Sequence, residues 1–159
     1  MKGVTIRRAR IADLPVICRM GLELTRYHDK HGEWQTTLAD RPVLKDLRKH
    51  FKKQIHSARS LVLVAELDGD VVGYSVSWLV KRPPIFVVKE HGYVDDVYVV
   101  KKHRRKGLAK LFLDEHYSWF RKKGVKLISI TWHASNALGK GAWEKYGFKP
   151  TLITGVRKI

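Results

Sequence analysis

The segment between residues 93 and 124 constrains the fold most, because it predicts a strand, a basic turn and a helix in direct succession. Residues 94–100 are rich in valine and include tyrosine, a composition typical of a partly buried strand. After the turn, Gly107 and Ala109 open a helix whose apolar residues recur at steps of three and four. The first N–H groups of a helix lack intrahelical partners, and the helix dipole adds positive potential there. This segment therefore predicts an anion-binding site.

The remaining sequence alternates between strand and helix patterns. The expected elements are strand 5–10, helix 13–28 with Asp13 as its N-cap, helix 42–55, strands 61–67 and 71–80 joined by a hairpin turn at Asp68-Gly69, the strand and helix of the 93–124 segment, strand 126–132, helix 136–146 and a last strand from Phe148. Hairpins in the first half and crossover connections in the second predict an α+β fold with a mixed sheet. The strands that flank the central helix should be parallel neighbours. Neither a linker nor a repeat interrupts the pattern, so we expect one domain over residues 1–159.

The charge balance is strongly basic. There are 32 Lys and Arg residues against 15 Asp and Glu residues, a formal net charge of +17. This charge favours polyanionic partners such as nucleic acid or phosphate-rich small molecules, although a solvated lysine-rich surface would have the same composition. No apolar run approaches the roughly 18 residues of a membrane span, and no secretory signal is visible, so we expect a cytoplasmic protein without a membrane partner. The single cysteine, Cys18, excludes an intramolecular disulfide and fits a reducing compartment.

Two motifs resemble signatures of the GNAT acetyltransferase superfamily. Arg104, Gly107 and Ala109 fit its coenzyme A motif, Gln/Arg-x-x-Gly-x-Gly/Ala, at a strand–helix junction. The second motif is an Asn followed by a short helix and a terminal Gly-Phe, and it is matched by Asn136, Ala142, Glu144, Lys145, Gly147 and Phe148. The resemblance implies a GNAT-like fold: a mixed, largely antiparallel sheet with splayed central parallel strands and flanking helices.

The same resemblance implies acetyl-CoA as the acyl donor, with no metal. Backbone N–H groups from Arg105 to Lys110 would cradle the pyrophosphate, because Gly107 and Ala109 carry no side chain that holds phosphates away. Where the central strands splay, backbone groups near Val97 and Val99 would bind the pantetheine arm. The residues expected to bind acetyl-CoA are Val97, Tyr98, Val99, Arg104, Arg105, Lys106, Gly107, Leu108, Ala109, Lys110, Asn136 and Trp143.

The implied reaction is direct transfer of the acetyl group to a primary amine of a small molecule, peptide or protein. An alkylammonium, with a pKa of about 10.4, must first lose a proton, and a carboxylate can accept it. Asp95 stands where many family members have a glutamate. By strand parity Asp95 should share a face with Val97 and Val99, and Asp96 should point the other way unless a bulge intervenes. The alternative is that both aspartates pair with nearby basic side chains at a solvated strand end.

The usual acid of this family is replaced. The family commonly uses a tyrosine seven residues after the Asn of the second motif to protonate the leaving thiolate, and here that position is Trp143. An indole N–H donates hydrogen bonds but is no acid at neutral pH. A thiolate, with a pKa of about 8.5 for a cysteine-type thiol, is a tolerable leaving group. Water could therefore protonate it, or the reaction could proceed without an acid. Tyr146 is better placed as a core residue.

The amine acceptor is not identified by the sequence. In this family the first helix and the loop after it cover the acceptor, so we expect Tyr27, His28 and Trp34 to bind substrate, together with His133 after strand 126–132. Ordinary packing or solvent exposure is the alternative for each. The eight histidines show no metal-binding spacing.

A different function class is a basic nucleic-acid-binding module without enzymatic activity, using the basic helix around residues 45–53. No helix-turn-helix, zinc-finger or aromatic RNA-binding motif accompanies that helix, and a solvated helix face is the plainer interpretation. The segment after Phe148 is short for the family, so its last strand is missing, merged or completed by a second copy of the chain. A homodimer is therefore one hypothesis for the assembly.

Overall fold

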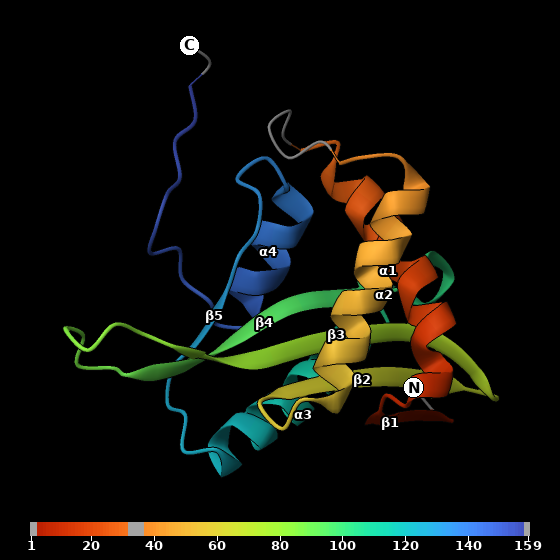
Figure 1. The fold of residues 1–159 in the computed structure, drawn as a ribbon, viewed down its shortest axis with the longest axis horizontal. Coiled ribbons are helices and arrows are strands. Elements are labelled where there is room, and N and C mark those ends of the chain that lie inside the picture. The colour runs from red at the N-terminus through yellow and green to blue at the C-terminus, as the bar shows by residue number, and fades with distance from the viewer. Residues whose placement is uncertain (1–2, 32–36, 158–159) are drawn as a thin grey trace.

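The protein is built on a five-stranded sheet with the strand order β1-β2-β3-β4-β5 (Figure 1). The computed structural model describes residues 3–31 and 37–157. The strands are β1 (Val4–Arg8), β2 (Ser60–Leu67), β3 (Asp70–Lys81), β4 (Glu90–Val99) and β5 (Ile128–Ile130). Each neighbouring pair is antiparallel except β4 and β5, which are parallel. The predicted α+β class, the mixed sheet and the parallel pairing of the two strands that flank the long helix are confirmed, with β5 at the edge of the sheet.

Helices cover both faces of this sheet (Figure 1). They are α1 (Leu14–His28), α2 (Asp40–His56), α3 (Leu108–Lys122) and α4 (Ala137–Lys145), with short 3₁₀ turns η1 (Ile11–Asp13) and η3 (Lys101–His103). One core cluster joins α1 and α2 to the sheet around Phe51 and Tyr74. A second core cluster joins α3 to the opposite face around Phe112 and Phe120. We call these two sides the α1/α2 face and the α3 face.

Backbone geometry at the turns follows the sequence. Asp68 and Gly69 both have positive φ angles, 52° and 84°, as the hairpin turn between β2 and β3 requires. Gly124 ends α3 with φ 74°. No helix among residues 3–31 and 37–157 combines the length and the apolar character that crossing a membrane requires.

The C-terminal segment departs from the sequence prediction. Residues 148–157 form neither strand nor helix, so the prediction of a last strand from Phe148 is wrong. Leu152 and Ile153 on this segment are 93% and 97% exposed. β5 is also shorter than predicted, with three residues. A strand of that length offers few backbone partners. Pairing with it would form too few hydrogen bonds to offset the conformational entropy that the C-terminal segment would lose.

Asp13 lies at the predicted start of α1 but does not cap it with its side chain. Its carboxylate accepts the Arg10 N–H at 2.6 Å and pairs with the Arg7 guanidinium at 2.8 Å. The Arg7 guanidinium holds the pKa of this largely buried carboxyl below its usual value. Asp13 is therefore the N-cap residue by position, as predicted, but its side chain ties β1 to the turn before α1 and makes no capping bond.

The buried face of α3 also differs from the expected apolar stripe. Leu111, which fits the three–four spacing, is 38% exposed, whereas Leu113 is buried. His116 is fully buried beside them on the same helix. A histidine on the core side of a helix is polar by type, so the apolar periodicity did not select it.

Candidate active site

A β-bulge in β4 places Asp95 and Asp96. Opposite them on β3, Val76 faces Asp96 and the next residue, Ser77, faces Val94, so Asp95 has no partner residue on β3. The extra residue reverses the alternation of side chains that follow it. The prediction that Asp95 shares a face with Val97 is therefore wrong.

Both carboxylates lie on the α1/α2 side of the bulge. The Tyr74 hydroxyl, which belongs to the α1/α2 core cluster, donates a hydrogen bond of 2.8 Å to Asp96 Oδ2. The Tyr93 hydroxyl lies beside Asp95, and the Tyr93 ring packs on Trp78 of the same cluster. By contrast, Val97 packs against the α3-face cluster. From the sequence, Asp96 was expected to point away from Asp95 unless a bulge intervened. The bulge is present, and it places the two aspartates on the same face.

The environment of this pair shifts its protonation. Burial raises the pKa of Asp95 well above that of an ordinary aspartate, and the neighbouring Asp96 charge raises it further. Burial likewise raises the pKa of Asp96, and the Tyr74 hydroxyl offsets part of that rise. A carboxylate whose pKa is moved toward neutrality is suited to accept a proton and release it again. Neither Tyr74 nor Tyr93 was selected from the sequence, because a strand tyrosine fits core packing equally well.

The edge of β4 opens directly after this point. Pairing with β5 joins Gly92 to Ile128, Tyr93 to Ser129 and Val94 to Ile130, and no later pair forms between the two strands. The Val100 N–H donates to the Val72 carbonyl on β3 at 3.0 Å. Because N–H groups alternate along a strand, those of Val97 and Val99 are directed away from β3, toward the opening. The two parallel strands therefore separate after Val94, as the predicted splay requires.

The N-terminus of α3 lies just beyond this open edge. Gly107 is its N-cap, with φ 85° in the left-handed region, and Arg105 also has a positive φ of 59°. The N–H groups of the first turn, from Leu108 to Lys110, precede any intrahelical carbonyl partner. A Cβ built on Gly107 would meet no atom within 4 Å, so there is open space beside this residue at the start of the helix. This geometry fits the phosphate cradle expected from the sequence.

The basic side chains around this turn are not equivalent. Arg104 turns back over β4, where its Nε donates to the Val99 carbonyl at 2.8 Å and its guanidinium lies 5.6 Å from the centre of the Tyr98 ring. Lys110 pairs with Asp114 at 2.6 Å. Arg105 and Lys106 are exposed. Of the basic side chains, Arg104 is therefore the one fixed against the open edge.

A shallow hollow of about 400 Å³ lies between α1 and the end of β4. The Tyr98 hydroxyl in its wall donates a hydrogen bond to the Glu23 carboxylate. The hollow is lined by Leu22, Glu23, Arg26, Tyr27, Lys30, Tyr98 and Arg104. Arg26 is already paired with Asp29 and Asp40, whereas Lys30 and Arg104 could donate to phosphate oxygens. Arg26 and Lys30 were missed in the sequence because basic residues near a helix end usually indicate a solvated face.

Histidines from two segments meet beside this hollow. The rings of His28 and His133 lie 5.5 Å apart, and those of His31 and His133 lie 6.0 Å apart. The Tyr27 ring packs against His31 at 4.9 Å. Burial, followed by the neighbouring imidazoles, lowers the pKa of His28. The structure thus brings Tyr27, His28 and His133 together as expected and adds His31, whereas Trp34 lies outside the described residues.

Asn136 and Trp143 have packing contacts of their own. Asn136 caps α4, because its Oδ1 accepts the Gly139 N–H at 2.9 Å, and it also accepts the Tyr27 hydroxyl at 3.0 Å. The Trp143 ring lies edge-on to Phe148 and borders the same α3-face cluster as Val97. Tyr146 also packs against that cluster, in line with the core role predicted for it. In the described chain no group of three or more His, Cys, Asp or Glu side chains is arranged to hold a metal ion.

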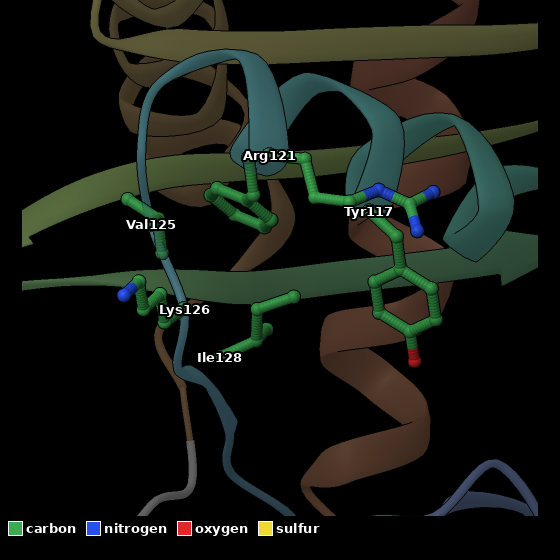
Figure 2. A pocket seen from close by; sticks show the side chains of 6 residues that line it. Tyr117, Arg121, Val125, Lys126 and Ile128 are labelled. Carbon is green, nitrogen blue, oxygen red and sulfur yellow. The ribbon is translucent and has the colours of Figure 1, made fainter.

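A second hollow, of about 480 Å³, lies between the later turns of α3 and the segment that leads into β5. Figure 2 shows Tyr117 and Arg121 on the helix side, and Val125, Lys126 and Ile128 on the segment side. Neither Asp95 nor Asp96 lines it. This hollow is therefore separate from the candidate active site.

Comparisons with known proteins agree with this geometry. The model of the acetyltransferase (GNAT) family matches residues 25–148. The chain is 28% identical to an L-amino acid N-acetyltransferase of Escherichia coli (strain K12) over 160 aligned positions, which cover 94% of this chain and 85% of the relative.

Solved structures show the same fold. A mutant form of a Bacillus halodurans protein superimposes with a TM-score of 0.81 at 21% identity, covering 98% of this chain and 99% of the other. A predicted acetyltransferase from Clostridium acetobutylicum, solved with acetyl-CoA, superimposes with a TM-score of 0.78 at 17% identity, covering 98% and 96% of the two chains. At these identities the likeness bears on the fold alone.

Proposed function

The chain belongs to the GNAT family of acetyltransferases, and we propose that it transfers the acetyl group of acetyl-CoA directly to a primary amine. The observation that carries this proposal is the bulge in β4. It sets the half-buried Asp95 and Asp96 carboxylates beside the strand edge that opens at Val97. A proton acceptor next to a row of unpaired backbone donors is what amine acylation needs.

In the proposed mechanism Asp95 takes the proton of the acceptor ammonium, directly or through one water. The freed amine nitrogen then forms a bond to the thioester carbonyl carbon, and the carbon–sulfur bond breaks so that sulfur leaves as a thiolate. The nitrogen, which still carries one proton more than an amide, releases that proton to water. The Val97 N–H, directed into the opening, stabilises the negative charge that develops on the carbonyl oxygen. Water returns a proton to the thiolate, because the Trp143 indole has no acidic proton at neutral pH.

The donor is held by backbone more than by side chains. Val97 and Val99 bind the pantetheine arm as a neighbouring strand would, and the first turn of α3 after Gly107 binds the pyrophosphate. Arg104 is fixed between these two regions and supplies one charge. The neighbouring Arg105 and Lys106 add positive potential from exposed positions.

The acceptor proposed first is a small amine of the amino acid type. The curated relative is an L-amino acid N-acetyltransferase, and the Tyr27, His28 and His133 cluster could line a pocket for a compact polar substrate. We also propose that the enzyme acts in the cytoplasm. The free cysteine, Cys18, is 6% exposed, and burial raises its thiol pKa, as expected of an unreactive thiol in a reducing compartment.

Calorimetry separates this proposal from nucleic-acid binding, for which the exposed basic side chains of α2 are the one specific candidate surface. We expect heat on titration with acetyl-CoA at ordinary ionic strength, and at most weak RNA binding. An RNA affinity that falls with salt as phosphate contacts predict, with no heat from acetyl-CoA, is the opposite result and would reject the enzyme proposal.

We further propose that a second copy of the chain covers the outer edge of β5. In the described chain β5 pairs on one side only, with β4. Apolar side chains are exposed on three parts of the chain: Ile85 and Val87 on the β3–β4 hairpin, Leu127 just before β5, and Leu152, Ile153 and Val156 on the C-terminal segment. That segment runs away from the sheet in Figure 1. An exchanged segment from a partner copy would cover both the edge and the hollow of Figure 2.

The double substitution Leu152→Ser and Ile153→Ser tests this assembly. We expect the unsubstituted chain to be a dimer by light scattering at micromolar concentration, and the double variant to be a monomer with unchanged helix content. Leu38→Ser is the control, since Leu38 is 70% exposed and lies before α2, far from β5 in the chain. A monomeric unsubstituted chain, or a dimer that survives the double substitution, contradicts the proposal.

A further inference from the structure

A buried polar chain links α3 to the bulge that carries the carboxylates. His116 on α3 has an exposure of 0%, and so do Ser75 and Ser77 on β3. His116 Nε2 lies 2.8 Å from Ser75 Oγ, and His116 Nδ1 lies 2.8 Å from Ser77 Oγ. Ser75 Oγ in turn reaches the backbone carbonyl of Asp96 at 2.7 Å.

The direction of each hydrogen bond in this chain follows from chemistry. A carbonyl oxygen only accepts, so the single Ser75 hydroxyl proton is donated to Asp96. Ser75 Oγ must then accept from His116 Nε2–H. Burial lowers the pKa of His116 to about 3, so the ring is neutral and its Nδ1 accepts from the Ser77 hydroxyl. Every O–H and N–H donor of the three side chains, and the free imidazole nitrogen, thus has a partner in one tautomer.

The position of the Asp96 carbonyl shows which part of β4 these hydrogen bonds hold. Asp96 is the first residue after the unpaired Asp95, where the regular ladder between β3 and β4 is interrupted. At an interruption of this kind the backbone is free to return to regular pairing, which would turn one aspartate to the opposite face. The hydrogen bond from Ser75 fixes the backbone of Asp96 from the α3 face, while Tyr74 fixes its carboxylate from the other face.

We infer that His116, acting through Ser75, is a positioning residue that holds the β4 bulge in the register that keeps Asp95 and Asp96 on one face. This inference rests on the proposed base role of the carboxylates. It gives a use to a fully buried histidine that touches neither the open edge of β4 nor the hollow beside α1. Because α3 also carries the expected phosphate cradle at Gly107, the same helix then positions both the donor and the base.

Ser75→Ala and Ser77→Ala form a matched pair of test variants. Each removes one hydroxyl from the same strand and one hydrogen bond from the same imidazole, but only the Ser75 hydroxyl bonds to an aspartate of the bulge. We expect Ser75→Ala to lower kcat by on the order of 10²-fold, the scale of a small misplacement of a reacting group. Its KM for acetyl-CoA should stay within about two-fold, well below the ten-fold that 1.4 kcal/mol of binding corresponds to. Ser77→Ala should keep a kcat close to that of the unsubstituted chain at a comparable loss of thermal stability.

A second pair addresses the histidine itself. His116→Gln can place an amide N–H near the Nε2 position and keep the bond to Ser75, whereas His116→Leu cannot. Activity should therefore be rescued in His116→Gln relative to His116→Leu.

Carboxyl NMR titration supplies a readout that does not depend on turnover. Groups with titratable protons face the pair from β3 (Tyr74) and β4 (Tyr93), and both remain in these variants. In Ser75→Ala the pKa values of Asp95 and Asp96 should fall toward that of an ordinary aspartate, because a relaxed bulge separates and hydrates them. Unchanged pKa values together with equal kcat in Ser75→Ala and Ser77→Ala overturn the inference. If the unsubstituted protein acetylates no amine, the proposed function fails. The titration still decides whether the hydrogen bonds from His116 through Ser75 hold the bulge.

Discussion

Replacing Asp95 with Asn is expected to lower the rate of amine acetylation at neutral pH by on the order of 10²-fold or more, the usual contribution of a general base. The substitution keeps the size of the side chain and removes its capacity to accept the proton of the substrate ammonium. Binding of acetyl-CoA should change little, because Asp95 faces the α1/α2 side whereas Val97 packs toward α3. Steady-state rates and calorimetry with acetyl-CoA measure the two effects separately.

Asp96→Asn is the matched substitution at the next position. It removes the like charge that raises the pKa of Asp95, so the acid limb of the pH–rate profile should move to lower pH while most of the rate at neutral pH is retained. Loss of rate in Asp96→Asn with full activity in Asp95→Asn would exchange the roles of the two carboxylates. Full activity in both variants would remove the pair from the mechanism.

The same pair should cost stability at neutral pH. A carboxyl whose pKa is higher in the folded than in the unfolded state stabilises the fold below its unfolded pKa, about 3.9, and loses that contribution as the pH rises through the folded pKa. The melting temperature of Asp95→Asn relative to the unsubstituted chain should therefore rise as the pH is raised from acid to neutral. An enzyme that loses activity and gains stability through this one substitution would show that the half-buried carboxylate is kept for function.

Gly107→Ala carries the second large effect, a loss of acetyl-CoA affinity of about ten-fold or more, equivalent to about 1.4 kcal/mol. A Cβ at this position would enter open space at the N-terminus of α3, where we place the pyrophosphate. An L-residue in the left-handed region also costs roughly 1–2 kcal/mol of folding stability. The affinity and stability losses must therefore be separated.

Gly124→Ala separates them. Gly124 has φ 74° at the opposite end of the same helix, and a Cβ there would also meet no atom within 4 Å. Both variants should lose similar stability in thermal unfolding, but only Gly107→Ala should lose affinity for acetyl-CoA by calorimetry. Equal dissociation constants for the two variants would place the phosphates elsewhere.

The order of the elements could be predicted from sequence because each depends on local patterns. The Asp68-Gly69 turn, the Gly124 helix end and the strand–turn–helix around Gly107 are determined by backbone chemistry that residue types reveal directly. The parallel pairing of β4 and β5 followed from the crossover connection between them. These features carried both the fold class and the expected position of the anion site.

The face on which the carboxylates lie could not be predicted in the same way. A bulge depends on which residue of β3 stands opposite Asp95, and strand parity alone gave the wrong face for that side chain. The hydrogen bonds that hold the bulge come from His116 and Ser75, which are 41 positions apart in the sequence. Periodicity in the sequence selects apolar residues, so it does not identify polar residues that face the core. The network can be recognised only in the folded structure, where α3 packs on β3.

The central claim is that the paired aspartates at the bulge activate an amine for acetyl transfer. The most direct measurement uses acetyl-CoA labelled in its acetyl group, incubated with L-amino acids, a polyamine and a peptide, followed by mass spectrometry of every product. We expect the label in an amide on the nitrogen of at least one acceptor, formed far more slowly by Asp95→Asn. Label found only in free acetate would contradict the account. So would an amide that both Asp95→Asn and Asp96→Asn form as fast as the unsubstituted chain.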